Sequence, residues 1–479
     1  MRYLTIFIFS FCCLFNQLTV AQQNPVTQFI QTEGMDAANT AVLLTDIKTG
    51  KIISSHEKDK PLTPASILKI VTTATALEVY GPDYRIETRL EYSGTIDSNG
   101  ILTGDIYIKG GGDPTLGSEH IGRSGNDFWT DCLAAIKKAG IKAIEGRIFA
   151  DETCFDGQGV SQKWLWEDLG NYFAAGSYGL SFCDNTYRIY FKSEGADTTP
   201  LIIRTEPNMK DIQFFNYVKA KNRNSDDAYI YGIPFVNTRW VFGTIPANQS
   251  SFFIKGDIPD PALYMAEQLH ETLIKASIRI SKNPSTYRLA KINQEAFSFE
   301  RKLLLSSYSP KLSDIIHETN VKSNNHYAEH LFKLIALSKY PQASFENAAE
   351  TVISCWKKRN VDLSNIYLYD GSGLSPVNRI SPQNMIDILV YMQRKSSYSK
   401  EFLASLPEAG KEGTVRNFLK NPKPKGTIQL KSGSISNVQC YAGYINQNDK
   451  QYAFCIMANH YSISRSALKK AMEKMILAW

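Results

Sequence analysis

Long apolar runs are absent from most of the chain, and this absence limits how the protein can meet a membrane. Past residue 21, no uninterrupted apolar stretch reaches the roughly 18 residues that cross a bilayer. We therefore expect at most peripheral membrane contact from the mature protein. Residues 1–21 differ. Arg2 precedes an apolar run from about Leu4 to Leu14, and the segment ends in Thr19-Val20-Ala21, a site of the small-residue kind at which a signal peptide is cleaved. This pattern is typical of a cleavable signal peptide and predicts an exported, periplasmic protein.

Cysteine is scarce, and clusters of like charge are missing. Two of the eight cysteines lie in the signal peptide, and no two of the others form a C-x-x-C pair, which argues against a disulfide framework. We expect buried free thiols, although Cys440 and Cys455 fall on neighbouring expected strands. The chain has 53 basic and 47 acidic side chains, and this mild excess is spread along the sequence. It gives no support for a nucleic-acid partner.

A phosphate-binding loop and a metal centre also lack full support. The stretch KGGGDPTL at 109–116 is rich in glycine, but no Gly-Lys-Ser/Thr follows it, so a turn is the better interpretation. His326 and His330 stand in HYAEH, which fits the H-x-x-E-H pattern of some zinc peptidases. No third ligand is identifiable, so we expect neither a metal nor another cofactor. A zinc peptidase remains an alternative, and loss of activity with a chelator would support it.

The length and the patterning predict several domains. A chain of 479 residues is too long for one ordinary core. Residues 41–57 predict a hairpin with its turn at Thr49-Gly50, and residues 427–459 predict three further strands. Residues 464–479 have apolar side chains at helical spacing and should pack on that sheet. The middle of the chain has many short strand-like runs instead.

These patterns predict an α/β (α+β) multidomain protein. Residues 22–90 and 285–479 would form one discontinuous domain, in which helices pack on an antiparallel sheet. Residues 91–284 would form an inserted, mainly β accessory region with two subdomains.

Two polar side chains stand at the start of an apolar helical pattern, in TPASILKIVTTA at 63–74. Thr63 is a good N-cap and Pro64 a good first helical residue, so the helix should begin there. Ser66 and Lys69, three positions apart, would then share one face. A lysine with a lowered pKa can take the proton of a serine hydroxyl, which makes the serine a nucleophile.

The Ser-x-x-Lys pattern is weak by itself, because it occurs four more times in the chain. Those other serines are Ser55, Ser354, Ser397 and Ser466. Two later stretches strengthen the first occurrence: Ser323 and Asn325 begin a helical pattern in VKSNNHYAEHL, and LKSGS places Lys431 at the end of a strand, followed by Ser432 and Gly433. In this order, Ser-x-x-Lys, Ser-x-Asn and Lys-Ser/Thr-Gly mark penicilloyl serine transferases.

The chain resembles the D-alanyl-D-alanine carboxypeptidases/endopeptidases known as low-molecular-mass type-4 penicillin-binding proteins. The long gap between Ser66 and Ser323 is typical of that family, which has domains inserted there. Further similar stretches are GDIYIKGGGDPTL (104–116), GNYFAAGSYGLSFCDN (170–185), YDGSGLSPVNRISP (369–382), LPEAGKEGTVRNF (406–418) and KSGSISNVQCYAGYI (431–445). Ser432 departs from the family, in which threonine is commoner, but a hydroxyl is retained. The resemblance implies a penicillin-binding transpeptidase/β-lactamase-like fold with β-rich domains inserted between the first and second motifs.

The resemblance also implies a reaction and its partners. Peptidoglycan stem peptides ending in D-Ala-D-Ala would acylate Ser66, with Lys69 as the general base and Ser323 as a proton relay to the leaving amine. The implied substrate-binding residues are Asn325, Lys431, Ser432, Gly433 and Ser434. β-Lactam antibiotics would be covalent inhibitors, and the backbone N–H groups of Ser66 and Ser434 would form the oxyanion hole.

Two expectations can be separated from the resemblance. Two lysines in one pocket should lower each other's pKa, so Lys431 should help to keep Lys69 neutral.

A peptidoglycan-binding protein with an idle serine is the second alternative, and a failure of penicillin to label Ser66 would favour it.

Overall fold

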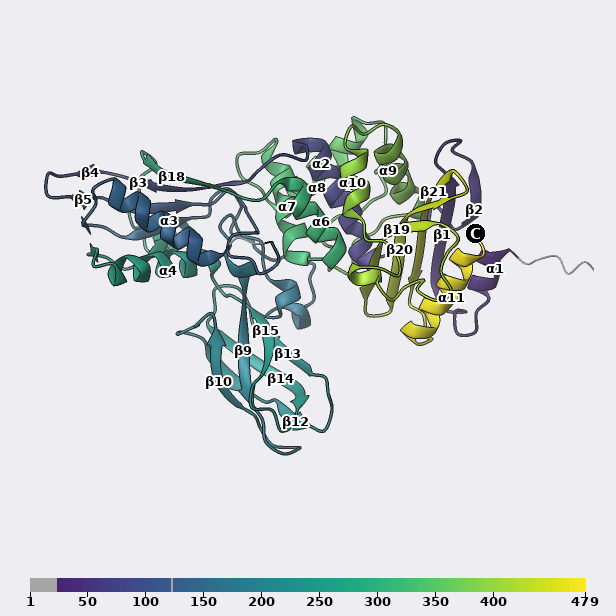
Figure 1. Ribbon diagram of the computed structural model, residues 1–479, viewed down its shortest axis with the longest axis horizontal. Coiled ribbons are helices and arrows are strands. Elements are labelled where there is room, and N and C mark those ends of the chain that lie inside the picture. The colour runs from purple at the N-terminus through teal and green to yellow at the C-terminus, as the bar shows by residue number, and fades with distance from the viewer. Residues whose placement is uncertain (1–23, 122–123) are drawn as a thin grey trace, which may run out of the picture.

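The computed structural model describes residues 24–121 and 124–479. The expected signal peptide, residues 1–21, lies outside the described residues. The described chain forms an elongated body with a lobe that projects from it (Figure 1). Of the helices in these ranges, none combines the length and the apolar character needed to cross a bilayer.

A five-stranded antiparallel sheet joins the two ends of the chain, in the order β19-β20-β21-β1-β2. Its strands are β19 (Thr427–Ile435), β20 (Val438–Gln447), β21 (Lys450–Asn459), β1 (Asn39–Asp46) and β2 (Ile52–His56). The predicted N-terminal hairpin and the three predicted C-terminal strands are therefore confirmed. Cys440 and Cys455, on β20 and β21, are buried free thiols as expected.

Helices cover both faces of this sheet (Figure 1). One face is covered by α2 (Lys69–Tyr80), α6 (Leu312–Lys322), α7 (Asn325–Leu337), α8 (Phe345–Lys357), α9 (Pro382–Arg394) and α10 (Ser399–Ser405). The other face packs against α1 (Pro25–Ile30) and α11 (Arg465–Leu477). Because side chains alternate along a strand, Leu43 of β1 lies in the first core and Leu44 in the second. Leu468 and Met472 of α11 lie in the second core, so the predicted packing of the C-terminal helix is confirmed.

A mixed sheet, β17-β8-β6-β3-β18, lies at the other end of the body. Its strands are β17 (Ser285–Thr286), β8 (Ile148–Asp151), β6 (Ile106–Lys109), β3 (Glu87–Tyr92) and β18 (Lys302–Tyr308). A smaller sheet contains β16 (Arg279–Ile280), β7 (Ala143–Ile144), β5 (Ile101–Thr103) and β4 (Thr95–Ile96). The accompanying helices are α3 (Gly125–Lys138), α4 (Pro261–Lys275) and α5 (Tyr287–Ile292). The expected border at 90/91 falls within β3, and the expected border at 284/285 lies directly before β17, so strands of the mixed sheet lie at both borders.

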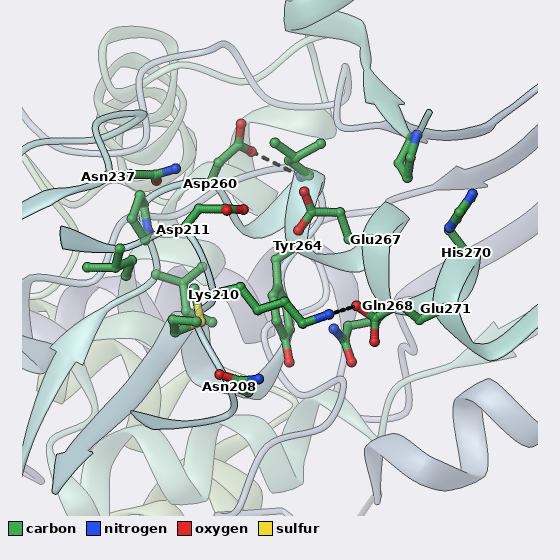
Figure 2. Close-up of a pocket in the computed structure, with 16 residues that line it drawn as sticks. Asn208, Lys210, Asp211, Asn237, Asp260, Tyr264, Glu267, Gln268, His270 and Glu271 are labelled. Atoms are coloured by element: carbon green, nitrogen blue, oxygen red, sulfur yellow. Dashed lines mark hydrogen bonds and ion pairs between the residues drawn. The ribbon is translucent and has the colours of Figure 1, made fainter. Parts of the chain in front are cut away.

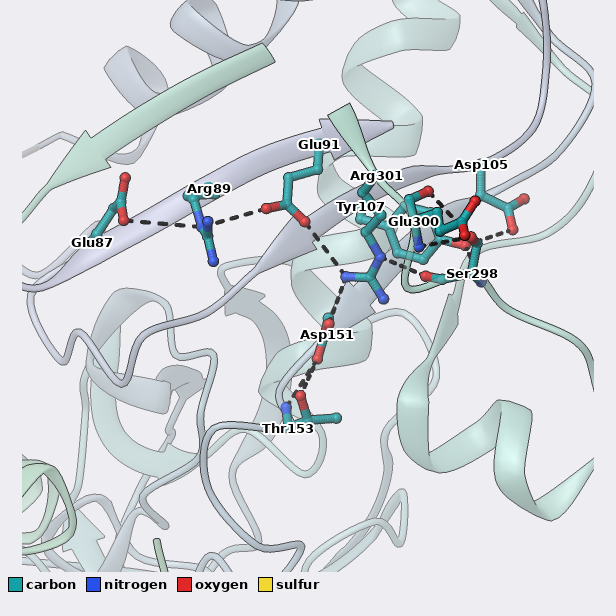
Figure 3. A network of polar contacts seen from close by, with 10 residues as sticks. All are labelled: Glu87, Arg89, Glu91, Asp105, Tyr107, Asp151, Thr153, Ser298, Glu300 and Arg301. Atoms are coloured by element: carbon teal, nitrogen blue, oxygen red, sulfur yellow. Dashed lines mark hydrogen bonds and ion pairs between the residues drawn. The ribbon is translucent and has the colours of Figure 1, made fainter. Parts of the chain in front are cut away.

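An arginine fixes the segment that leads into β18 (Figure 3). Arg301 Nη1 lies 2.6 Å from Asp151 and 3.6 Å from Glu91, and the guanidinium carbon lies 3.8 Å from the centre of the Tyr107 ring. Burial by itself raises the pKa of Asp151, but hydrogen bonds from Thr153 and Arg301 lower this pKa overall. The chain therefore enters β18 beside a buried ion pair between Arg301 and Asp151.

The projecting lobe is built from strands of two small sheets. The first contains β10 (Leu201–Glu206), β9 (Thr186–Lys192) and β15 (Phe252–Asp257). In the second, β14 (Thr238–Pro246) pairs in parallel with β11 (Gln213–Asn216) and β12 (Lys219–Lys221), and antiparallel with β13 (Asp227–Tyr231).

The beginning of the first motif differs from the prediction. A short 3₁₀ turn at Ala65–Leu68 precedes α2, and Ala65 has a φ of +46°, in the left-handed region that L-residues seldom adopt. Thr63 does not cap the helix, since its hydroxyl donates to the Pro376 carbonyl at 3.0 Å. The prediction of Thr63 as the N-cap and Pro64 as the first helical residue was wrong, because a contact with a distant loop replaces the local cap. Ser66 thus lies on a strained turn ahead of the helix.

Candidate active site

Ser66 and Lys69 face each other across one turn, so the shared face predicted from their spacing is confirmed. Lys69 Nζ lies 3.0 Å from Ser66 Oγ, 2.7 Å from Asn325 Oδ1 and 2.8 Å from the carbonyl oxygen of Ser372. The lysine is completely buried. A neutral amine has two protons and one lone pair. The amide and carbonyl oxygens can accept both protons, which leaves the lone pair for the hydroxyl of Ser66.

Burial determines the charge of the two lysines. It lowers the pKa of Lys69 to about 7, although the carboxylates of Glu329 and Asp370 oppose this effect. Burial also lowers the pKa of Lys431 well below its usual value, and Lys69 adds to that shift. The expected repulsion between the lysines therefore acts on Lys431, whereas the low pKa of Lys69 comes mainly from burial. A base whose pKa is near 7 is suited to catalysis at neutral pH.

Ser323 stands at the turn between α6 and α7. It ends α6 with φ 59° and ψ 38°, a left-handed conformation that breaks the helix. Lys431 Nζ, from β19, lies 2.8 Å from Ser323 Oγ and 2.8 Å from the carbonyl oxygen of Ser432. The second and third motifs are therefore in direct contact.

Asn325 is the first residue of α7, and both ends of its side chain are used. Its Oδ1 accepts from Lys69, and its Nδ2 donates to the carbonyl oxygen of Phe173 at 2.8 Å. Phe173 belongs to the segment between the first two motifs. Asn325 thus connects this inserted segment to the lysine beside the candidate nucleophile.

Gly433 allows β19 to approach the nucleophile closely. A Cβ at this position would lie 2.9 Å from the backbone nitrogen of Ser66, so no other residue fits without a shift. Ser434 follows it on the strand and is exposed. Ser432, the residue before Gly433, has its Oγ 2.8 Å from Thr414 Oγ1, a partner that was not predicted from the sequence.

A cavity of about 670 Å³ opens at this site. Four of the predicted site residues line it, namely Ser66, Ser323, Asn325 and Ser434. The cavity is also lined by Asp168, whose pKa is raised to about 6 by burial and by Glu167. Arg465, the first residue of α11, also lines the cavity. Neither Asp168 nor Arg465 belongs to a motif, so the sequence analysis missed both.

Glu329 positions one of the acceptors of Lys69. Its two carboxylate oxygens accept from the backbone N–H groups of Gly371 at 2.8 Å and Ser372 at 2.9 Å. These bonds hold the two peptide groups that come just before the one whose carbonyl oxygen contacts Lys69; the N–H of that third peptide, on Gly373, donates to Asp370. Burial and the neighbouring Asp370 raise the pKa of Glu329.

Asp370 holds the rest of the same loop. It accepts from the backbone N–H groups of Gly373 at 2.9 Å and Ser375 at 2.6 Å, and from Trp164 Nε1 at 2.9 Å. Gly373 has a φ of +81°, and a Cβ there would lie 2.0 Å from the carbonyl oxygen of Ala65. The sequence signal for this loop was the stretch YDGSGLSPVNRISP, to which we had assigned no role.

Two residues of the HYAEH segment, His330 and Glu329, make internal contacts. His330 Nε2 lies 2.8 Å from Ser181 Oγ, its Nδ1 lies 2.8 Å from the His326 carbonyl oxygen, and Glu329 binds the loop above. In the part of the chain that the structure describes, one group of possible metal ligands lies within 4.8 Å, and it contains no HYAEH residue. That group is Glu119, His120 and Asp184.

A second cavity, of about 270 Å³, lies beside α4 and the loop before β11 (Figure 2). It has acidic side chains, and burial together with Asp211 and Asp260 raises the pKa of Glu267 to about 7. Lys210 pairs with Glu271 at its edge. No residue of the three motifs lines it. Of these two cavities, only the one of about 670 Å³ contains the candidate nucleophile, Ser66.

The profile of the D-Ala-D-Ala carboxypeptidase 3 (S13) family matches residues 22–478. The chain belongs to this family. A D-alanyl-D-alanine carboxypeptidase from an Actinomadura species is 25% identical over 457 residues, which cover 91% of this chain and 80% of that protein. The crystal structure of penicillin binding protein 4 (dacB) from Haemophilus influenzae has a TM-score of 0.79 at 25% identity, covering 95% of this chain and 98% of that one.

A further crystal structure of the Haemophilus influenzae protein, complexed with a novel β-lactam, has a TM-score of 0.74 at 23% identity, with 95% of this chain and 98% of that one covered. The recognised family and the predicted multidomain fold class are confirmed. As a member of the S13 family, the chain is a serine-type peptidase.

Proposed function

We propose that this S13-family protein is an exported serine DD-peptidase that cleaves peptidoglycan stem peptides at D-Ala-D-Ala ends, at cross-links, or at both. The reaction proceeds through an acyl-enzyme on Ser66. The observation that carries this proposal is the buried amine of Lys69, 3.0 Å from Ser66 Oγ, with two further oxygens to accept its protons. β-Lactams inhibit the protein by acylating the same serine.

Acylation begins when Lys69 takes the proton of Ser66 and Ser66 Oγ attacks the penultimate D-alanine carbonyl. The oxyanion that forms accepts from the backbone N–H groups of Ser66 and Ser434. The close approach of Gly433 to the Ser66 nitrogen supports this pairing, because it brings the end of β19 to the nucleophile. Removing one such donor typically costs about 10²- to 10³-fold in rate.

The amine of the leaving D-alanine then needs a proton, and the carboxylate of the same D-alanine needs a positively charged partner. Ser323 relays a proton to the departing amine, and Lys431, 2.8 Å from its hydroxyl, polarises it. Lys431 and the hydroxyls of Ser432 and Ser434 bind the terminal carboxylate, and Arg465 lines the same cavity. Water afterwards hydrolyses the ester on Ser66.

Labelling with a fluorescent penicillin, followed by a denaturing gel, tests the proposal. We expect a covalent band that Ser66→Ala abolishes. Ser354→Ala is the matched control, because Ser354 also precedes a lysine by three positions and should leave the band unchanged. A wild-type protein that gives no band would return a peptidoglycan-binding role to first place. Peptidase activity that a chelator abolishes and penicillin spares would favour the zinc alternative.

The bond preference and the cellular location need separate measurements. Purified muropeptides resolved by mass distinguish loss of one D-alanine from a pentapeptide from splitting of a cross-linked dimer. Cell fractionation tests the export that residues 1–21 predict, and a protein retained in the cytoplasm would contradict it.

A further inference from the structure

One face of the projecting lobe is covered by aromatic side chains. A sheet that faces water normally has polar residues at alternate positions, but three strands of the second lobe sheet have aromatic residues there. We call this surface the aromatic face. It consists of Phe215, Tyr217, Tyr229, Tyr231, Trp240 and Phe242. The intervening Ile230 and Val241 are completely buried in the core of the lobe.

The rings of the aromatic face are held against one another. Phe215 and Trp240 are cross-strand neighbours whose ring centres lie 5.9 Å apart with planes 13° from parallel. The ring of Tyr217 stacks on that of Phe242 at 4.8 Å and 11°, and Tyr231 meets Phe242 edge-on at 5.7 Å. This packing fixes the rings before any ligand arrives, which lowers the entropy lost on binding.

Mutual packing still leaves much of each ring in water. Trp240 is 39% exposed, Phe242 43% and Tyr217 53%. Contiguous exposed apolar surfaces of this kind mark binding sites more often than chance, because leaving them in water has no benefit for folding. The aromatic face is therefore a candidate binding surface.

The aromatic face continues into the cavity of the candidate nucleophile. Tyr229 and Tyr231 line that cavity together with Ser66. Trp166, which is 66% exposed, stacks on Tyr231 with ring centres 4.9 Å apart. A substrate bound at Ser66 would therefore meet the aromatic face if it extended past the cavity on that side.

We propose that the aromatic face binds the glycan strand of peptidoglycan while a stem peptide occupies the cavity. This inference rests on the proposed function, because a stem peptide is attached to that strand. Pyranose rings present C–H faces that pack on aromatic rings. The sugar backbone is uncharged where the lactyl carboxyl of each muramic acid is amidated by a stem peptide, and all six side chains of the face are uncharged as well. Along β14, charged residues begin beyond Phe242: Lys219 of β12 and Asp227 of β13 are the strand neighbours of Thr244.

Binding to glycan strands that an amidase has freed of stem peptides, measured at high salt to screen the lactyl carboxylates that the amidase exposes, tests the inference without any contribution from the cavity. We expect the wild type to bind and the Trp240→Ala and Tyr217→Ala variants to bind about tenfold more weakly each, the usual value of one aromatic contact. Phe253→Ala is the matched control, because Phe253 is 44% exposed on the other lobe sheet. It should bind as the wild type does. Penicillin labelling should be equal in all four proteins.

The outcomes separate this inference from the proposed function. If the wild type binds glycan but is not labelled by penicillin, the proposed serine peptidase function is refuted and the aromatic face is still a glycan-binding site. No glycan binding, or equal binding by the wild type and the Trp240→Ala variant, overturns the inference. A dimer in sedimentation that Trp240→Ala dissociates, in a protein that binds no glycan, would assign the face to a second copy of this chain and also overturns it.

Discussion

Replacing Glu329 by glutamine should slow acylation and move its pH dependence in a defined direction. Glu329 accepts from two buried backbone N–H groups, whereas glutamine has one acceptor oxygen and an amide that would face the other donor. One buried N–H is then unpaired, at a cost of about 1–3 kcal/mol. The loop can relieve this cost by rotating, but rotation moves the Ser372 carbonyl from its place 2.8 Å from Lys69.

The magnitude and the pH shift follow from the same contacts. If about 1.4 kcal/mol of that cost appears in the transition state, the limiting acylation rate falls about tenfold. The ionised form of Glu329 raises the pKa of Lys69, which is about 7 in the folded protein, while burial raises the pKa of Glu329 itself to about 8, so the two groups compete for a proton near neutral pH. Removing this charge lowers the pKa of the base, so the acid limb of the acylation rate should shift to lower pH.

Stopped-flow acylation by a fluorescent penicillin from pH 5 to 9 measures both effects. Glu318→Gln is the matched control, because Glu318 is also buried but faces His120 and not the loop. An acid limb of Glu329→Gln that stays in place or moves to higher pH would refute the electrostatic part of this reasoning. A limiting rate equal to that of the wild type would refute the positional part.

Three further predictions test other contacts. Lys431→Ala should lower the acylation rate even at saturating substrate, because it removes the partner of Ser323 Oγ, and equal rates from pH 6 to 9 would contradict this. Gly433→Ala should nearly abolish penicillin labelling, since the added Cβ would meet the backbone of Ser66, and normal labelling of a folded variant would show that β19 can move. Arg301→Gln should lower the free energy of unfolding by about 3–5 kcal/mol, because it leaves Asp151 buried without its ion pair. The pKa of Asp151 is lowered in the folded protein, so this stabilisation exists above the unfolded value near about 3.9 and is lost as the pH falls through the folded value. Thermal denaturation at pH 7 and pH 3 should show a loss that shrinks in acid, and an equal loss at both values would be inconsistent with a charge effect.

The sequence predicted which motif residues would meet better than it predicted the structure around them. Ser66 and Lys69 met as their spacing required, and the two later motifs together with the family-like stretches distinguished them from the four other Ser-x-x-Lys pairs. The helix start was wrong because Thr63 bonds to Pro376, and no local pattern reports a partner more than 300 positions away. The role of Glu329 was hidden for the same reason. Its position in HYAEH suggested a metal, while its partners are backbone N–H groups, which have no sequence signature.

The contacts of Lys69 explain why the separate motifs must act together. Its three partners come from residues 66, 325 and 372, so three segments distant in sequence have to assemble before the amine is oriented. Asn325 extends this dependence, because its amide binds Phe173 in the segment between the first two motifs. That segment also leads to Trp166, which stacks on the aromatic face. The same backbone segment that contacts Asn325 beside Lys69 therefore also contacts the proposed glycan surface.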